Sequence, residues 1–409
     1  MSRLRIACVV QRYGIEVNGG AEFHCRILAE RLARNHRVDV LTTRAIDYVT
    51  WRDEYPEGAV DINGVCVRRF RVDAPRETRE FAKMSRIVAA SPHTKEDEIQ
   101  WMRLQGPYSS RLLDYLERHR TAYDVFLFVT YLYGTTYFGI PIVADRAILV
   151  PTAHDEWPIY LNIFDRVFQD ARYLICNTPE ELAFLRRRFF GLDLKGEVVG
   201  VGFDPPSSKL PSDPQWDALR GRIGSSPFVL YVGRIDESKG CGTLMEFFQR
   251  YVAEFPQRDL KLVMMGKPSM AVPEHPRLLT AGFVSETAKL HAIRACRFMV
   301  TPSPYESLCF AAIEAWLMRK PVFANGNCSV LRGQCIRSDG GLWYAGYPDF
   351  REGMNCLLDN DALVRTLGRQ GYAFAEQNYT WEEVDKKFAR ILSSVASPAP
   401  RRALSTSPS

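Results

Sequence analysis

The sequence predicts an α/β fold with two doubly wound domains, each a parallel sheet covered by helices on both faces. Three observations support this prediction. The chain has 409 residues, more than one hydrophobic core usually supports. Apolar runs of about five to seven residues, typical of buried parallel strands, alternate with helical patterns in two separate series. A segment rich in Pro, Ser and Gly, residues 204–227, stands between the two series as a linker.

The first series predicts strands within residues 4–10, 36–43, 65–72, 123–130, 146–153, 171–178 and 197–203. Between them, an amphipathic helix is expected over residues 21–35, and further helices over the charged region 76–120. The second series predicts strands within residues 228–235, 260–266, 297–303 and 320–326, with helices from Thr243 and from about Leu308. A final helix is expected over 381–396, followed by a disordered tail at 397–409. The predicted domains are residues 1–203 and 228–380.

Composition and charge exclude several classes of protein. The ten cysteines are scattered without a C-x-x-C pair, which indicates reduced thiols in a cytosolic protein and no zinc site. A net charge of +5, from 53 basic and 48 acidic residues, gives no specific indication of nucleic acid as a partner. The N-terminal apolar run is too short for a signal peptide, and no run approaches the roughly 18 residues of a membrane span. We therefore expect a cytoplasmic protein that could contact the inner membrane surface through "FLRRRFFG" (184–191).

Two glycine-containing stretches are candidates for nucleotide-binding motifs. "GGAE" places Gly19 and Gly20 before the first helix, where backbone amides can approach a phosphate or can simply form a turn. "GVGFDP" has Pro205 where a dinucleotide motif requires a third glycine, and no helical pattern follows directly. The sequence is therefore a poor fit to a Rossmann dehydrogenase.

Polar residues follow the predicted strands, at the end where α/β sheets carry their sites. His154 in "TAHDEWP" lacks further residues at metal-ligand spacing, so it either contacts substrate or makes a structural hydrogen bond. In "YVGRIDESKG" the strand ends at Gly233, and Arg234 and Lys239 offer a fork of donors and a point charge. That combination suits a diphosphate, although two loop cations can also be merely solvated.

The stretch "PSPYESLCFAAIEAW" (302–316) carries two glutamates around an apolar run. Glu306 lies in the turn and can accept hydrogen bonds from sugar hydroxyls. Glu314 has apolar neighbours on both sides, so we expect a polar partner, and the ribose of a nucleotide is our candidate. The helix is expected to begin at Leu308 and to direct the amides of the segment 308–310 (Leu308, Cys309 and Phe310) at a phosphate.

These passages together resemble retaining glycosyltransferases of GT-B fold, specifically glycosyltransferase family 4. The matching stretches are "GGAE", "HDE", "GRIDESKG", the Glu-x7-Glu pattern of "ESLCFAAIEAW" with "RKPVFANG" behind it, and "YTWEEV". They occur in the family's order from residue 6 to about residue 392, which is nearly the whole chain. The resemblance implies two Rossmann-like domains facing a cleft, with the final helix (381–396) crossing back to the first domain.

The resemblance also implies residue roles. The catalytic residues are His154 beside the transferred sugar, Arg234 and Lys239 at the diphosphate, and Glu306 at the sugar. The donor-binding residues are Gly19 and Gly20 at the phosphate or acceptor, Gly233, Arg234, Lys239, Glu306, the segment 308–310, and Glu314 at the ribose. One departure stands out: the family often has Gly-Phe-Gly after the first glutamate, where this chain has Ser307, Leu308 and Cys309. Backbone contacts would tolerate this replacement, whereas the larger side chains would narrow the choice of donor.

The implied reaction is hexosyl transfer with retention from a UDP-, GDP- or dTDP-sugar to a glycan, lipid-linked or small-molecule acceptor, as in polysaccharide biosynthesis. No cofactor and no metal are expected, because Arg234 and Lys239 would neutralise the leaving diphosphate. Two alternatives stay open: a sugar-nucleotide 2-epimerase of the same fold and a non-catalytic sugar-nucleotide-binding protein. A phosphorylase-like enzyme would need a pyridoxal-phosphate lysine.

Overall fold

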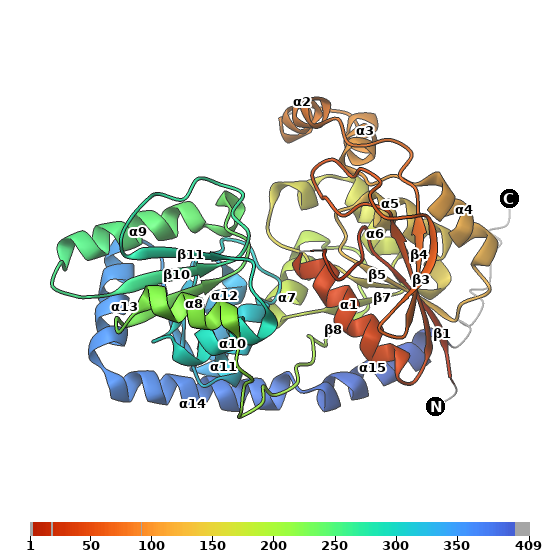
Figure 1. The fold of residues 1–409 in the computed structure, drawn as a ribbon. Coiled ribbons are helices and arrows are strands. Elements are labelled where there is room, and N and C mark those ends of the chain that lie inside the picture. The colour runs from red at the N-terminus through yellow and green to blue at the C-terminus, as the bar shows by residue number, and fades with distance from the viewer. Residues whose placement is uncertain (1–2, 18, 91, 397–409) are drawn as a thin grey trace, which may run out of the picture. The chain divides into compact units, whose positions relative to one another are not determined.

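The computed structural model describes residues 3–17, 19–90 and 92–396, so the predicted tail at 397–409 lies outside the described residues. The chain divides into two compact units: unit 1 is Met1–Val201 with Asp385–Ser409, and unit 2 is Gly202–Val384. Each unit has one sheet whose strands are almost all parallel (Figure 1). The predicted α/β class with two doubly wound sheets is therefore confirmed.

The sheet of unit 1 has eight strands in the order β3-β4-β2-β1-β5-β6-β7-β8. Their bounds are β1 Arg5–Val9, β2 Arg37–Thr43, β3 Gly58–Ile62, β4 Val65–Phe70, β5 Val125–Val129, β6 Ala147–Val150, β7 Tyr173–Cys176 and β8 Gly196–Val198. All neighbouring strands are parallel except the edge strand β3, which pairs antiparallel with β4. The sequence did not predict β3, because its residues are mostly exposed and lack a buried apolar run.

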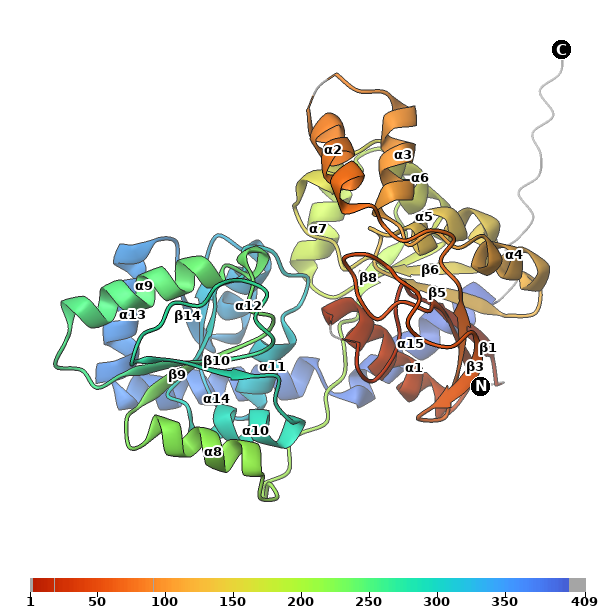
Figure 2. The same cartoon turned by 45° about the horizontal axis from the view of Figure 1, so that its top comes forward.

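The helices of unit 1 are α1 Gly20–Ala33, α2 Thr78–Ala89, α3 Lys95–Gln105, α4 Ser110–His119, α5 Gly134–Gly139, α6 Ile163–Asp170 and α7 Pro179–Arg188, with 3-10 turns at Ile140–Ile142, Ala144–Arg146 and Trp157–Tyr160. Hydroxyl side chains begin three of them: Thr94, Ser109 and Thr178 accept from backbone amides of the first turns of α3, α4 and α7. The charged region 76–120 thus forms the predicted helices, and α2 lies beside α3 (Figures 1 and 2).

The sheet of unit 2 has six parallel strands in the order β11-β10-β9-β12-β13-β14. Their bounds are β9 Phe228–Val232, β10 Lys261–Met265, β11 Leu278–Gly282, β12 Met299–Thr301, β13 Val322–Asn325 and β14 Gly341–Tyr344. The chain builds outward from β9 to one edge and then from β12 to the other. The strand order therefore reverses between β9 and β12, the position at which doubly wound sheets bind ligands.

The helices of unit 2 are α8 Pro214–Ile223, α9 Cys241–Glu254, α10 Glu286–Ala295, α11 Phe310–Leu317, α12 Ser329–Ser338, α13 Tyr347–Asp359 and α14 Asp361–Asn378, with a 3-10 turn, η4, at Glu237–Lys239. Helix α8 lies inside the segment 204–227 that we expected to be a linker. Asp213 caps it by accepting from the amides of Gln215 and Trp216, and Trp216, Leu219 and Ile223 are buried. Local Pro and Ser content concealed this helix.

Helix α15, Trp381–Ala396, is divided between the two units, and its residues from Asp385 on belong to unit 1. Asp385 accepts from Arg31 Nε of α1 at 2.9 Å, and Lys387 Nζ donates to the carbonyl of Val198 at 3.3 Å. The C-terminal part of this helix therefore packs within unit 1, as predicted.

In the part of the chain that the structure describes, no helix combines the length and the apolar character that a membrane crossing requires.

Candidate functional site

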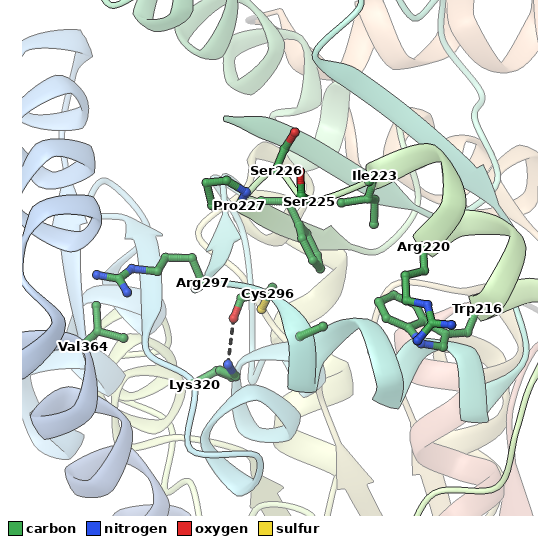
Figure 3. Close-up of a pocket in the computed structure, with 13 residues that line it drawn as sticks. Trp216, Arg220, Ile223, Ser225, Ser226, Pro227, Cys296, Arg297, Lys320 and Val364 are labelled. Atoms are coloured by element: carbon green, nitrogen blue, oxygen red, sulfur yellow. Dashed lines mark hydrogen bonds between the residues drawn. The ribbon is translucent and has the colours of Figure 1, made fainter. Parts of the chain in front are cut away.

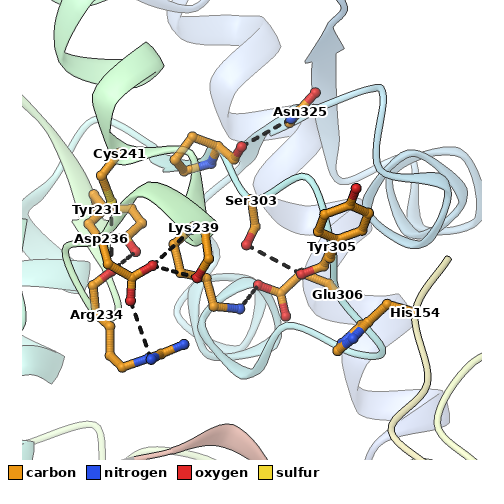
Figure 4. A network of polar contacts seen from close by, with 12 residues as sticks. His154, Tyr231, Arg234, Asp236, Lys239, Cys241, Ser303, Tyr305, Glu306 and Asn325 are labelled. Carbon is orange, nitrogen blue, oxygen red and sulfur yellow. Dashed lines mark hydrogen bonds and ion pairs between the residues drawn. The ribbon is translucent and has the colours of Figure 1, made fainter. Parts of the chain in front are cut away.

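The candidate site of unit 2 lies at the carboxyl ends of β9 and β12, where the strand order reverses. The loop after β9 carries Gly233, Arg234 and Lys239, and the loop after β12 carries Glu306 (Figure 4). Lys239 Nζ lies 2.7 Å from Glu306 Oε1. The structure thus brings together two of the predicted residues, which are 67 positions apart in the sequence.

Two local features fix the loop that carries Lys239. Asp236 Oδ1 accepts from the amide of Lys239 at 3.0 Å and from Ser238 Oγ at 2.6 Å, which caps the turn η4. Gly240 follows with φ 71°, and a Cβ there would lie 2.4 Å from the carbonyl oxygen of Pro302. Only glycine permits both the conformation and the approach, so Gly240 allows the loops of β9 and β12 to touch.

Lys239 and Glu306 form a charged pair that is partly open to solvent, with 27% and 16% of their side chains exposed. Burial alone would lower the pKa of Lys239, but the Glu306 carboxylate outweighs it and holds that pKa above 10.5. The Lys239 ammonium is therefore charged at neutral pH. The pair offers an ammonium and a carboxylate side by side, suited to a ligand that carries both an anion and hydroxyl groups.

Arg234 belongs to the same loop but contacts a different carboxylate. Its Nη1 lies 3.3 Å from Asp236 Oδ2, and 36% of its side chain is exposed. Its backbone carbonyl accepts from Tyr231 Oη at 2.6 Å, so a buried side chain of β9 fixes the backbone of this residue. Arg234 is thus held at its main chain, while its guanidinium remains accessible to a ligand.

Glu314, in the second turn of α11, meets a protein partner that we did not predict. Lys289 Nζ of α10 lies 2.7 Å from Glu314 Oε1 and 2.9 Å from Glu286 Oε1. Burial would lower the pKa of Lys289, but these two carboxylates outweigh it and raise the pKa above 10.5. The polar partner that the apolar surroundings of Glu314 required is therefore Lys289 in this structure, and no ligand is needed to explain the carboxylate.

Helix α11 begins at Phe310, two residues later than predicted. Cys309 precedes it with φ 69°, a left-handed conformation that ends the preceding turn, and no side chain caps the helix. Leu308 is buried and lies outside the first helical turn. Of the three predicted phosphate-facing amides, those of Leu308 and Cys309 therefore do not belong to the helix, whereas Phe310 is its first residue.

In unit 1, a contact within the unit explains why one residue of the glycine pair, Gly19, is a glycine. Glu22 Oε1 accepts from Gln11 Nε2 at 2.8 Å, and from Arg12 Nε at 2.9 Å and Nη2 at 2.6 Å, which joins α1 to the loop after β1. A Cβ on Gly19 would lie 2.0 Å from Glu22 Oε2, so Gly19 makes room for this carboxylate. Gly20, by contrast, is exposed, and a Cβ added there would meet no atom within 4 Å.

His154 lies in the loop after β6, and its side chain is 27% exposed. Its Nδ1 is 3.4 Å from Glu156 Oε1. The loop is anchored by Glu181 of α7, whose two oxygens accept from the amides of Ala153 and Asn177, each at 2.6 Å. Glu181 is only 1% exposed. The fully buried carboxyl therefore ties together the loops after β6 and β7 and positions the neighbour of His154.

Burial raises the pKa of Glu181 from 4.5 to about 7. The folded protein thus binds this proton more tightly than the unfolded chain, and the contribution to stability is full below pH 4.5 and is lost as the pH rises to about 7. Such a pKa change corresponds to about 3 kcal/mol in the free energy of unfolding. We expect wild type to lose this much relative to Glu181→Gln between about pH 4 and 8 in urea titrations.

Glu80→Gln is the matched control for Glu181→Gln, because Glu80 is an exposed residue of α2 in the same unit. Its free energy of unfolding should follow that of wild type at every pH. Parallel pH curves for wild type and Glu181→Gln would show that Glu181 titrates alike in the folded and unfolded chain.

Sequence reasoning missed Lys289, Glu22 and Glu181 as residues that position the site. Glu22 stands within the quoted "GGAE", so a carboxylate two residues after a glycine pair was an available signal. Lys289 lies in an ordinary helical pattern 25 residues before Glu314, and nothing in that pattern distinguishes it.

Residues 226–360 match the family model of the Glycosyl transferases group 1. Among curated proteins, D-inositol 3-phosphate glycosyltransferase of Rhodococcus opacus is 28% identical over 237 residues, which are 53% of this chain and 52% of the relative. The chain spans about half the length of the curated relatives it matches.

Solved structures resemble the fold over nearly the whole chain. Sucrose-phosphate synthase from Thermosynechococcus elongatus superposes with a TM-score of 0.69 and 18% identity, covering 96% of this chain and 99% of that one. Anabaena HepE in complex with UDP-glucose gives 0.66 and 13% identity, covering 96% and 100%. At these identities the likeness concerns the fold alone.

Proposed function

From the GT-B fold, and from the match of residues 226–360 to the family model of the Glycosyl transferases group 1, we propose that the chain is a retaining, metal-independent glycosyltransferase. It moves a hexosyl group from a nucleoside-diphosphate sugar to the hydroxyl of a glycan, lipid-linked or small-molecule acceptor. The observation that carries the proposal is the pair of Lys239 and Glu306 at the strand-order reversal of unit 2. The complex of the structural neighbour HepE with UDP-glucose supports this class of donor.

The donor's parts match the charges of unit 2. Lys239 and Arg234 bind the diphosphate, because they supply a point charge and a planar fork of donors in one loop. Glu306 accepts hydrogen bonds from the sugar hydroxyls, and the phosphate displaces it from Lys239 or shares that ammonium with it. Glu314 accepts from the ribose while Lys289 fixes its carboxylate in place. Gly233 is the first residue after β9, and without a side chain it lets the backbone approach the donor.

The chemistry rests on the leaving group. As the bond between the anomeric carbon and the diphosphate breaks, negative charge grows on the diphosphate oxygen, where Lys239, Arg234 and the first amides of α11 stabilise it. The same oxygen takes the proton of the attacking acceptor hydroxyl, so the acceptor enters on the face that the diphosphate leaves and the anomeric configuration is retained. The two cations supply the charge that a divalent metal supplies elsewhere.

Unit 1 contributes the acceptor side of the proposal. His154 contacts the transferred sugar, and Gly20 offers an open backbone position at the start of α1. Gly19 serves chiefly to admit Glu22. Helices α2 and α3 and the segment at Phe190, which is 94% exposed beside a run of arginines, are candidates for acceptor or membrane-surface contact. All ten cysteines are unpaired thiols, which supports a reducing compartment.

The proposal is tested by incubating the full chain with UDP-, GDP- and dTDP-hexoses and following melting and products. The correct donor should raise the melting temperature, since ligand at a hundredfold excess over Kd stabilises by about 2.7 kcal/mol. Slow hydrolysis to the sugar and the nucleotide is expected without acceptor, and an acceptor should give a product with the donor's anomeric configuration by NMR. Activity should persist in full in excess EDTA.

Other outcomes of this experiment would identify one of the two alternative functions. Conversion of the donor into an isomeric sugar nucleotide would identify an epimerase, and binding without any turnover would identify a binding protein. Loss of activity in EDTA that Mg²⁺ restores would contradict metal independence while leaving the transferase assignment intact.

A further inference from the structure

A cavity of about 550 Å³ lies in unit 2 at the amino ends of the strands (Figure 3). It is bordered by the loop 224–227 before β9, by residues 295–297 before β12, and by Lys320 before β13. The strands are parallel, so their amino ends lie at the opposite end of the sheet from their carboxyl ends, where Lys239 and Glu306 lie. The cavity is therefore separate from the proposed donor site, and the proposed transfer reaction assigns it no role.

The cavity is cationic. Its lining includes Arg220, Arg297 and Lys320, and among the described residues that line it there is no carboxylate. The guanidinium of Arg297 is already engaged: Nε and Nη2 donate to the carbonyls of Leu357 and Leu358, and Nη1 pairs with an aspartate of α14. Arg220 is 67% exposed, with one aspartate of its own helix at 3.4 Å. Arg220 and Lys320 are therefore the cations that can turn to a ligand.

Lys320 differs from the other two lysines of unit 2 described above. Its Nζ donates to the backbone carbonyl of Cys296 at 2.8 Å, the contact drawn in Figure 3. Burial lowers the pKa of Lys320 below 10.5, and the nearby charge of Arg297 lowers it further. Lys239 and Lys289, each 2.7 Å from a glutamate, have raised pKa values instead. An anion in the cavity would give the Lys320 ammonium the countercharge that a carboxylate gives the other two.

The remaining walls suit a flat or apolar body. Trp216 and Ile223 of α8 and Val364 of α14 line the cavity, and Ser225 and Ser226 add hydroxyls to its lining. We propose that this cavity binds a small phosphorylated compound with a ring, whose phosphate contacts Lys320 and Arg220 and whose ring lies against Trp216 and Ile223. Bound there, the compound bridges α8 to the starts of β9, β12 and β13.

A purely structural role for Lys320 is the alternative, because its ammonium donates to the carbonyl of Cys296 at the end of α10. Titration calorimetry of the full chain with phenyl phosphate, inorganic phosphate and phenol separates the two. We expect saturable binding of phenyl phosphate, weaker binding of phosphate and none of phenol. Lys320→Met and Arg220→Met should each weaken phenyl phosphate about tenfold or more, the usual effect of losing a charged hydrogen bond.

Two variants control for the site of binding. Arg222→Met removes an exposed cation from the same helix that does not line the cavity, and Lys239→Ala removes the lysine of the proposed donor site. Both should keep wild-type affinity for phenyl phosphate. Affinity lost in Lys239→Ala but kept in Lys320→Met and Arg220→Met would place the anion in the donor site and overturn the proposal. Absence of binding to wild type, or equal loss in Arg222→Met, would also overturn it. If Lys320→Met fails to fold, the exposed Arg220 decides.

Discussion

Replacing Lys239 by alanine is expected to lower kcat about 10²–10³-fold, while KM for the donor rises much less. This is the cost of removing one preorganised donor from a developing negative charge. The Lys239 ammonium contacts the diphosphate in the ground state and in the transition state. The contact is stronger in the transition state, where the glycosidic bond is breaking and negative charge develops. Steady-state kinetics with saturating acceptor measure both constants, and a circular dichroism melt of the variant shows that the assayed protein is folded.

Arg234→Lys and Lys209→Ala complete the experiment. Arg234→Lys should remain impaired, because a point charge cannot replace a planar fork of donors. Lys209 is an exposed lysine of unit 2, and its replacement should leave kcat within about twofold. If Lys239→Ala and Arg234→Lys also retain kcat within that margin, the residues are ordinary surface cations and the donor site lies elsewhere.

Replacing Lys289 by methionine is expected to lower the free energy of unfolding by about 3 kcal/mol, because it leaves a buried carboxylate without its cation. Glu314 is 13% exposed, and Lys289 lies 2.7 Å away. The double variant Lys289→Met/Glu314→Leu should recover most of the loss, because two apolar side chains replace the pair and no charge is stranded. Urea titration of the two single variants and the double variant gives the coupling directly.

A measurement of donor affinity distinguishes a ribose-binding role of Glu314 from a purely structural role. If its carboxylate contacts the ribose, the double variant should be stable and yet bind the donor about tenfold or more weakly. A stable double variant with wild-type donor affinity would show that the pair is only structural. Arg120→Met is the control for stability, because Arg120 and Glu117 form an exposed i,i+3 pair that should contribute no more than about 0.5 kcal/mol.

The sequence predicted most of what depends on local pattern and less of what depends on distant contacts. Buried strands such as β5 and β9 are visible as uninterrupted apolar runs, so both sheets could be anticipated. The exposed edge strand β3 carries no such run and was missed. Helix α8 has the helical spacing of buried residues, at Trp216, Leu219 and Ile223, but it was missed because the Pro and Ser residues before it are typical of a loop.

The same distinction applies to the candidate site. Lys239 and Glu306 could be predicted as site residues because both follow strands. In a parallel sheet the carboxyl ends of neighbouring strands lie at the same end of the sheet. Lys289 could not be named, since its contact with Glu314 arises from the packing of α10 beside α11 and leaves no periodic signal. The start of α11 was placed two residues early because it depends on the backbone angle of Cys309, which propensity does not predict for a cysteine.

Cys309 also shows how this loop can change its sequence without changing its backbone. With φ 69°, the position is one where glycine is free of strain and a side chain costs about 1–2 kcal/mol. A glycine there, however, would enlarge the conformational freedom of the unfolded chain, which costs the fold about 0.4–1 kcal/mol. The second term offsets the first only in part, and glycine remains favoured by about 1 kcal/mol. Exchange of cysteine for glycine at this position should therefore stabilise unit 2 slightly and leave the backbone at the start of α11 as it is.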